Sequence, residues 1–514
     1  MLTYCVTSSR KHVEADTRTV PEGATWSAEI CIVGAGPAGL ALAEALRASG
    51  RSIVVLEGGQ AGIPAEAQAL PVSTSGGVDS QELHQARARG LGGTAGIWNT
   101  RFGGSAWAKY LPLDDMDFLP RDWVPWSGWP MTSDMLQPWY RRAYALCGMG
   151  GHERHVMSAA RADPLHLGVF LLGPAAQFCI TLPAALRLST NVILVTGATA
   201  TGLGRSAGGR VTEVRWSSDT GKRGTVHAEV FVLAAGGIEN ARFLLADRAR
   251  KTRSWSTDDW LGRGFMEHPI DRSVRVRSRD PVLGLGEEFL APQDVGGGGV
   301  VVGRIGLAPA LLRAERLPNL SIRLGENQAS HLVPPAALRS SLHRVIPSQR
   351  LRRMIGTAAR RVLASGERWR GTEHRLLIDL EQWPDPDNRV VLTAQRDRHG
   401  QPGAMLHWRW REAEEGLRVR ARAVVVREMK RAALGDIRVL ADVPIDSHAH
   451  HHAGTTRMHA DAGQGVVDAD LLVHGEENLY VVGSSVFPTA GVANPTFTIV
   501  ALSARLAEHL LVKT

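Results

Sequence analysis

The chain has 514 residues, of which 44% are hydrophobic and 21% charged. These values are ordinary for a globular protein, and no run of about 18 uncharged apolar residues suggests a transmembrane helix. The formal net charge is +8, and only six of the 59 basic residues are lysines. No nucleic-acid-binding motif accompanies this charge, so we expect neither a nucleic-acid partner nor stable membrane insertion.

The N-terminal residues are polar and contain no apolar signal core, which predicts an N-terminal extension over residues 1–25 that is poorly ordered. The four cysteines, Cys5, Cys31, Cys147 and Cys179, show no CxxC spacing. This pattern argues against a disulfide framework and against a thiolate metal site, and a reducing cytoplasm fits best. An arginine-rich stretch over residues 339–375 is interpreted as a solvated helical face.

Residues 28–59, AEICIVGAGPAGLALAEALRASGRSIVVLEGG, contain the first informative motif. The run 30–33 is typical of a strand, and Gly34, Gly36 and Gly39 then form a GxGxxG turn before a helix over 38–47. A second strand over 53–56 leads to Glu57, whose carboxylate is placed to accept hydrogen bonds from ribose hydroxyls. The segment predicts a dinucleotide site, and the loop alone leaves FAD and NAD open.

Three later segments are also informative, and the last two of them have the same strand–turn–helix character. They are residues 86–104 with Gly92 and Gly93, residues 226–247 with a strand that ends in AAGG, and the C-terminal block with a strand over 479–482 and a final helix. The two glycines at 92 and 93 are expected to let the backbone lie flat against a planar ring. The alternation of strands and helices predicts an α/β fold with a Rossmann-like domain.

These segments closely resemble the glucose-methanol-choline (GMC) oxidoreductases, which are FAD-dependent alcohol oxidases and dehydrogenases. The resembling motifs are GAGPAGLALAEAL, GLGGTAGIWN, AAGGIENARFLL, GRGFMEHP, PDPDNRVVL, HHAGTTRM and NLYVVGSSVFPTAGVANPTFTIVALSARLA, in the order of the family from residue 28 onwards. The C-terminal block is the most specific of them. Residues 275–380 carry little that can be matched.

The resemblance implies FAD, held by a discontinuous domain over 26–110, 186–272 and 440–514. The segments 111–185 and 273–439 would form a substrate domain around an antiparallel sheet, to which residues 388–410 would contribute two strands. Four tryptophans over 121–143 are expected mainly to pack. The residues expected to hold FAD are Gly34, Gly36, Pro37, Ala38, Gly39, Glu57, Gly58, Gly92, Gly93, Thr94, Trp98, Asn99, Ala200, Ala235, Gly236, Gly483, Ser484, Asn494, Pro495 and Thr496.

Some family members attach FAD covalently through a histidine in the loop after the paired glycines. The corresponding residue here is Ile97, which cannot form that bond, so non-covalent FAD is predicted. Trp98 and Asn99 would lie against the flavin. A second family position also differs, because RM is followed by His459 where glycine is usual, and this puts the local turn geometry in question.

The sequence HAHHHAGTTRMH, residues 448–459, holds five of the 19 histidines. The resemblance assigns the base to His451, three residues before Gly454, and pairs it with Asn494. Oxidation of an alcohol removes a hydride, which flavin N5 can take, and a proton, which a neutral histidine can accept. Asn494 would hold the developing alkoxide, although it is also placed to cap the helix that Pro495 begins.

Alternatives remain open at this stage. His450 or His452 could be the base, whereas a metal site is not expected because consecutive side chains diverge. His268 in MEHP is expected to support the FAD domain. The predicted substrate is a small polyhydroxylated alcohol, either a sugar, a glycoside or an aminoglycoside intermediate in antibiotic biosynthesis, with O₂ or another oxidant as acceptor. The alternative is a sterol or aliphatic-alcohol oxidase.

Overall fold

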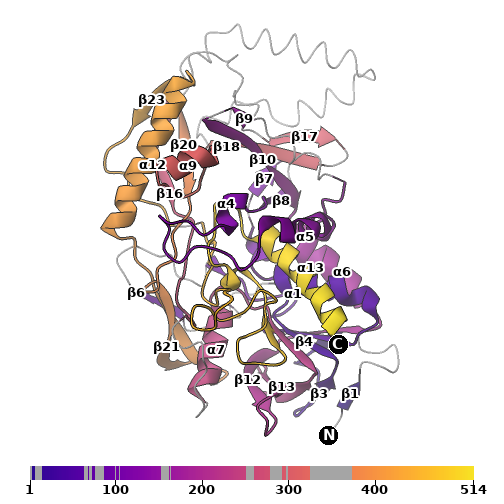
Figure 1. Ribbon diagram of the computed structural model, residues 1–514. Coiled ribbons are helices and arrows are strands. Elements are labelled where there is room, and N and C mark those ends of the chain that lie inside the picture. Colours follow the sequence, from indigo (N-terminus) through magenta and orange to yellow (C-terminus); the bar gives the residue numbers. More distant parts are fainter. Residues whose placement is uncertain are drawn as a thin grey trace, which may run out of the picture.

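The computed structural model describes residues 3–5, 14–62, 68, 72–75, 86–98, 100–102, 105–151, 161–162, 164–250, 260–277, 292–296, 299–324, 373–447 and 449–513. Figure 1 shows the arrangement of the elements. Asn99, His448 and nearly all of the arginine-rich stretch over 339–375 lie outside the described residues. In the part of the chain that is described, no helix combines the length and the hydropathy that crossing a bilayer requires.

A six-stranded parallel sheet carries the dinucleotide motif. Its order is β2 (Glu14–Asp16), β11 (Val192–Thr196), β5 (Ile53–Glu57), β4 (Ile30–Val33), β15 (Val230–Leu233) and β24 (Leu479–Val481). The four inner strands are buried throughout, as expected for a parallel sheet that is covered on both faces. Helix α1 (Pro37–Leu46) follows β4 and packs against the C-terminal helix α13 (Thr496–Lys513), as Figure 1 shows.

The N-terminal segment is part of this fold, so the prediction of a poorly ordered extension is wrong for residues 14–25. Strand β2 pairs in parallel with β11. Ala15 and Val20 are buried, and the Thr17 hydroxyl donates to the Gly197 carbonyl. The polar composition misled the prediction because the segment is held by backbone pairing at a sheet edge and buries only a few small side chains.

A ten-stranded sheet forms the second layer. Its main path runs β23 (Asp436–Val439), β16 (Ile270–Arg277), β20 (Glu373–Leu380), β19 (Leu320–Leu324), β18 (Gly299–Leu307), β10 (Leu165–Pro174), β8 (Ser105–Tyr110) and β7 (Thr100–Phe102), with β17 (Pro292–Gly296) and β9 (Arg161–Ala162) beside it. All of its pairs are antiparallel. The long helix α12 (Glu412–Arg431) packs on β16 and β23 and closes an apolar core there.

The predicted hairpin over 388–410 forms, but not in the large sheet. Strands β21 (Arg389–Arg396) and β22 (Pro402–His407) are antiparallel, and β22 pairs in parallel with β6 (Val72–Ser75). Helix α7 (Glu239–Ala249) contacts both strands of the hairpin, and Ile238 and Val390 share a small core at this place. The assignment of this hairpin to the antiparallel substrate sheet is therefore corrected.

The remaining described elements connect these layers. A five-stranded sheet has the order β1 (Thr3–Cys5), β3 (Thr25–Ser27), β14 (Arg223–His227), β13 (Val211–Ser217) and β12 (Thr199–Arg205). Short helices are α4 (Asp115–Phe118), α5 (Ser133–Leu146), α6 (Leu182–Arg187) and α9 (Pro309–Ala314), with helical turns at Arg47–Ser49, Gly93–Ile97, Gln177–Thr181 and Ser484–Val486. The predicted α/β class with a Rossmann-like sheet is confirmed.

Candidate active site

Within the GxGxxG turn, protein packing requires glycine at positions 34 and 39 but not at position 36. Gly34 has φ of 108°, and a Cβ on it would lie 2.6 Å from the Ala234 carbonyl oxygen; on Gly39 it would lie 1.9 Å from the Gly34 oxygen. A Cβ on Gly36 would meet only the Cα of Gly93, at 3.9 Å. The space beside Gly36 is open, as close approach of a pyrophosphate to the backbone requires.

The Gly92–Gly93 pair lies against this turn. The N–H of Gly92 donates to the Ala35 carbonyl at 2.8 Å, and a Cβ on Gly93 would lie 3.0 Å from the Cα of Gly36. A Cβ on Gly92 would lie 2.6 Å from the Cys179 sulfur. Protein packing thus requires glycine at both positions, and contact of this backbone with a planar ring stays a prediction.

Glu57 ends β5 under the same turn. Its carboxylate accepts the N–H of Ala35 at 3.0 Å and the N–H of Gly59 at 2.8 Å. Burial raises its pKa, while the backbone donors and the nearby Arg89 guanidinium oppose that rise. The side chain therefore holds the phosphate loop in shape, and its contact with a ribose stays a prediction.

One buried asparagine joins the β15–α7 turn to the C-terminal block. Asn240 accepts the N–H of Ala235 at 2.8 Å, and its amide donates to the Ser485 hydroxyl at 3.0 Å. The neighbouring Ser484 hydroxyl donates to the His452 carbonyl at 2.6 Å. Three segments that are distant in sequence thus meet at one edge of the parallel sheet, where Ala235, Gly236, Gly483 and Ser484 are found together.

The segment after the paired glycines carries Trp98 and Ile97. The ring of Trp98 packs edge-on against Tyr110 and Phe178, with centroids 6.4 and 6.1 Å apart. Ile97 is 40% exposed. Thr94 lies between Gly93 and Trp98 and is half-buried, Pro37 and Ala38 begin α1, and Ala200 lies in β12.

His451 and Asn494 meet, as predicted. The Asn494 amide nitrogen lies 2.9 Å from Nε2 of His451. Helix α13 begins at Thr496, and its first turn uses the Pro495 carbonyl as acceptor for the N–H of Ile499. The Asn494 side-chain nitrogen is therefore directed to His451, and its contact with substrate, favoured over capping of the helix, stays a prediction.

Two residues that sequence reasoning did not place at the site contact His451. Nδ1 of His268 lies 2.8 Å from Nδ1 of His451, and the Glu267 carboxylate accepts the backbone N–H of both histidines. Burial is the main cause that lowers the pKa of His268 to about 4 and that of His451 well below its usual value. Both rings are neutral at neutral pH, as a base waiting for a proton must be.

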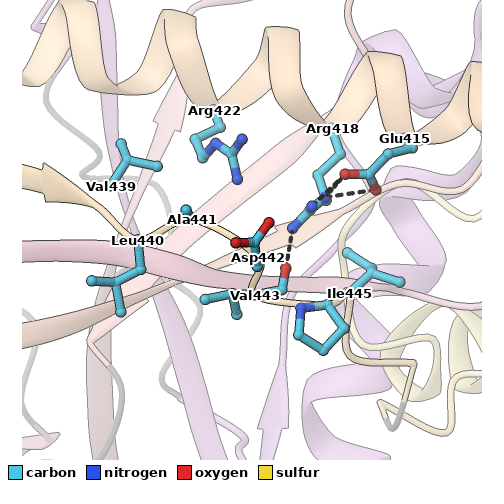
Figure 2. Close-up of a pocket in the computed structure, with 10 residues that line it drawn as sticks. Glu415, Arg418, Arg422, Val439, Leu440, Ala441, Asp442, Val443 and Ile445 are labelled. Atoms are coloured by element: carbon cyan, nitrogen blue, oxygen red, sulfur yellow. Dashed lines mark hydrogen bonds and ion pairs between the residues drawn. The ribbon is translucent and has the colours of Figure 1, made fainter.

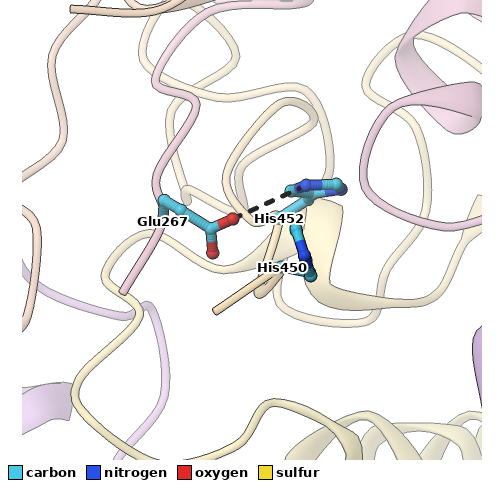
Figure 3. A group of neighbouring side chains, drawn as sticks. All are labelled: Glu267, His450 and His452. Carbon is cyan, nitrogen blue, oxygen red and sulfur yellow. Dashed lines mark ion pairs between the residues drawn. The ribbon is translucent and has the colours of Figure 1, made fainter. Parts of the chain in front are cut away.

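Glu267 also contacts the rest of the histidine loop, as Figure 3 shows. Its carboxylate lies 3.6 Å from Nε2 of His452, and burial raises the pKa of Glu267 to about 8. His450 has φ of 58°, and its ring lies beside that of His452, with centroids 6.4 Å apart. The loop therefore directs the ring of His451 toward His268 and Asn494, whereas the rings of His450 and His452 lie beside each other.

Glu267, His450 and His452 are the candidate metal ligands in the part of the chain that the structure describes. One ligand atom each from Glu267, His450 and His452 lies within 4.8 Å of the others. The expected divergence of consecutive side chains separates His451 from this group but does not separate His450 from His452. The group could hold a divalent cation after a small contraction, but its carboxylate already accepts backbone N–H groups, so we assign it first to holding the loop.

The substitution of His459 for the usual glycine leaves the turn intact. His459 is not in the left-handed region, and its N–H donates to the Val467 carbonyl at 2.9 Å. No glycine is needed at this position. Among the four tryptophans, Trp123 and Trp129 donate to Leu317 and Thr489, as packing residues do, whereas Trp126 is 45% exposed.

A pocket of about 580 Å³ lies between α12 and the segment 439–445. Figure 2 shows Arg418 and Arg422 pointing from the helix toward that segment. Arg418 pairs with Glu415 and donates to the Val443 carbonyl, while Arg422 donates to Ser273. None of the predicted site residues lines this pocket, and its arginines already have protein partners.

Comparison with known proteins agrees with this architecture. Residues 384–503 match the model of the GMC oxidoreductase family, and residues 32–61 match that of an NAD(P)-binding Rossmann-like domain. The chain is 22% identical to the fructose dehydrogenase large subunit of Gluconobacter japonicus, over 95% of this chain and 98% of that protein. It is 24% identical to the 6'''-hydroxyparomomycin C oxidase of Streptomyces lividus, over 94% and 92%.

A shorter match and a solved structure extend the comparison. The C-glycoside 3-oxidase of Microbacterium trichothecenolyticum is 37% identical over 22% of each chain. The crystal structure of pyridoxine 4-oxidase from Mesorbium loti superposes with a TM-score of 0.54 at 16% identity, covering 94% of this chain and 99% of that one, which shows a shared fold.

The dinucleotide-binding sheet, the buried histidine–asparagine pair and these matches together define an FAD-dependent oxidoreductase that acts on CH–OH groups. Residues 384–503 carry the match to the GMC oxidoreductase family, and the two relatives that match along nearly the whole chain are 22% and 24% identical to it.

Proposed function

We propose that the protein oxidises an alcohol group of a sugar-like, polyhydroxylated substrate to the carbonyl, with His451 as general base. The observation that carries the proposal is the 2.9 Å contact between Nε2 of His451 and the Asn494 amide. An alcohol whose hydroxyl replaces this direct contact can give its proton to Nε2 while the amide donates to its oxygen. Positioned base catalysis is worth roughly 10²–10⁴-fold.

The residues present fit FAD, because the open face of Gly36 offers the close backbone approach that a pyrophosphate needs. Bound FAD supplies the two-electron oxidant for the C–H bond. The phosphate loop with Glu57, the turn at Ala235–Gly236 and the segment from Gly483 would hold it. In this proposal residues 26–110, 186–272 and 440–514 form the FAD-binding domain, and 111–185 and 273–439 the substrate domain and connecting segments.

FAD is proposed to be bound non-covalently. Ile97 stands where some family members have the linking histidine, and its side chain offers no nucleophile. Acid precipitation of the purified protein should leave the yellow chromophore in the supernatant. Chromophore that stays with the pellet would contradict this part of the proposal.

The relatives support the substrate class. Two of them, by their names, act on fructose and on an aminoglycoside, and a third on C-glycosides. Trp126 is 45% exposed, and its ring packs edge-on against Trp260, with centroids 5.9 Å apart. O₂ or another oxidant would reoxidise the flavin. The unpaired thiols of Cys31, Cys147 and Cys179 fit a reducing cytoplasm.

The test is an anaerobic panel of alcohols that is scored by bleaching of the visible flavin absorption. The panel contains free sugars, glycosides and paromomycin-type aminoglycosides on one side, and cholesterol and long-chain primary alcohols on the other. We expect bleaching by members of the first group. Bleaching by sterols or aliphatic alcohols alone would favour the alternative, and no bleaching by any alcohol would refute the proposed reaction.

A further inference from the structure

We propose that His268 fixes which ring nitrogen of His451 carries the hydrogen, and so keeps the reactive lone pair on Nε2. This inference rests on the proposed role of His451 as the base. His268 lies two residues before β16 and 183 residues before His451, and its role is that of a positioning residue.

The hydrogen-bond chain has one consistent assignment when it is followed from Asn494. The amide NH₂ of Asn494 donates to Nε2 of His451, which must then be the unprotonated nitrogen. The hydrogen of neutral His451 is consequently on Nδ1, which faces Nδ1 of His268 at 2.8 Å. Nδ1 of His268 must accept this hydrogen, so His268 carries its own hydrogen on Nε2.

The surroundings of His268, at the other end of this hydrogen-bond chain, support the same assignment. The carbonyls of Ala490 and Gly491 lie near the His268 ring and raise its pKa against the larger effect of burial. Nε2 of His268 is buried and makes no hydrogen bond within the described residues. Because Nδ1 of His268 is taken by His451, Nε2 is the nitrogen on which these carbonyls favour a hydrogen, while the Asn494 amide donates at the other end of the pair.

Charged groups around the pair come from several elements. On the His451 side they are Lys109 of β8 and Arg323 of β19, with His452 on its own loop; on the His268 side they are Asp379 and Glu381 near the end of β20. The basic groups disfavour a proton on His451, and the carboxylates favour one on His268. When Nε2 of His451 takes the alcohol proton, the positive charge is therefore shared toward His268 through the Nδ1 hydrogen.

The experiment compares His268→Leu with His268→Asn in the holoenzyme. The asparagine carbonyl can replace Nδ1 as an acceptor, whereas leucine cannot accept. Nitrogen NMR of ring-labelled histidine, with the His451 signals identified by their loss in His451→Gln, reports the tautomer directly. We expect hydrogen on Nδ1 of His451 in the wild type and in His268→Asn, and a mixture or the reverse in His268→Leu.

The second readout is the rate constant of flavin reduction in each variant. It is measured with the alcohol from the panel that reduces the wild-type flavin fastest. His268→Leu should lower the rate constant about 10-fold or more, within the roughly 10²–10⁴-fold that the base supplies. FAD content and KM should be unchanged, and the acidic limb of the pH profile should move to lower pH because the protonated His451 loses an acceptor. His268→Asn should recover most of the rate.

Two failures can be told apart. If His451→Gln reduces its flavin at the wild-type rate, the proposed function is wrong. If His451→Gln is inactive while His268→Leu keeps the wild-type tautomer, rate and pH profile, only the role of His268 is refuted. An equal loss in His268→Leu and His268→Asn with an unchanged His451 tautomer also refutes it, because that result indicates a packing role.

Discussion

The side-chain amide of Asn494 lies 2.9 Å from Nε2 of His451, although 43 residues separate them in the chain. The contact exists because the Ser484 segment is hydrogen-bonded to the carbonyl of His452, which fixes the histidine loop against the start of α13. Helix packing and catalysis therefore depend on the same few loop contacts.

Replacement of His451 by alanine should slow flavin reduction by roughly 10²-fold or more without loss of FAD, because only the base is removed. Anaerobic stopped-flow absorbance measures both quantities. His452→Gln is the matched control, since the ring of His452 faces Glu267 and not Asn494. An inactive His452→Gln beside an active His451→Ala would move the base by one residue.

Gly36→Ala should affect FAD binding, whereas Gly39→Ala should affect folding. The methyl group at position 36 meets nothing closer than 3.9 Å, so that variant should fold with a wild-type melting temperature but retain little FAD. At position 39 the methyl group would lie 1.9 Å from a carbonyl oxygen, so that variant should be destabilised or insoluble. Flavin content per folded protein and thermal melting separate the two outcomes.

A glycine inside α12 provides the control for this pair. A Cβ on Gly416 would meet nothing within 4 Å, and alanine is favoured over glycine in a helix by about 1 kcal/mol. Gly416→Ala should raise the melting temperature slightly and leave FAD content unchanged. Full FAD occupancy in Gly36→Ala would contradict the assignment of the open face to the pyrophosphate.

The free energy of unfolding should fall below about pH 4.5 and above about pH 6.5 for reasons that lie in the histidine loop, because the two effects described next oppose each other between these values. Burial lowers the pKa of His452 from 6.5 to about 3, so its contribution is present above pH 6.5 and is lost as the pH falls toward 3. Burial raises the pKa of Glu267 from 4.5 to about 8, so its contribution is present below pH 4.5 and is lost as the pH rises through 8.

Urea unfolding across this range, with two variants, measures both effects. Glu267→Gln keeps an acceptor for the backbone N–H groups and should flatten the alkaline side alone. His452→Gln should flatten the acid side alone. If the free energy of unfolding of Glu267→Gln still falls with rising pH as steeply as that of the wild type, the buried Glu267 carboxyl does not cause the fall.

Breaking the buried pair of Arg121 and Glu381 should be costly. The guanidinium donates twice to the carboxylate, at 2.7 and 2.6 Å, and the two side chains are 2% and 0% exposed. Arg121→Met leaves a buried carboxylate without its cation and should lower the free energy of unfolding by about 3–5 kcal/mol. The double variant with Glu381→Leu should cost less than Arg121→Met alone, as urea unfolding can measure, and a larger cost would contradict this account.

Local motifs made much of the site predictable from the sequence. The turn at Gly34 and the acid at Glu57 follow from residues whose spacing is set by one short stretch of backbone, whereas the pairing of His451 with Asn494 was predicted from the resemblance to the GMC family. The hydrogen bond between Glu267 and His451 spans 184 residues and depends on how β16 meets the histidine loop. The only signal was the adjacent acid and histidine in MEHP, which the sequence alone does not direct toward the base.

The partner of the hairpin 389–407 was not predictable for a related reason. Alternating residues and a Gly-containing turn specify two antiparallel strands, but not the sheet that they join. Strand β22 pairs with β6, and the small core around Ile238 and Val390 packs the hairpin against residues of α7 that are more than 140 positions earlier in the chain. The N-terminal strand β2 was missed because backbone pairing leaves little trace in composition.

The outer position of β24 in the parallel sheet has a consequence for biosynthesis. Strand β15 pairs with β4 on one side and receives residues 479–481 on the other. A ribosome exposes Phe231 and its neighbours long before it makes residue 479, so the nascent chain presents an apolar strand edge to the cytosol for about half of its synthesis. Chaperone supply should therefore govern the yield of soluble enzyme during expression more strongly than the stability of the finished protein does.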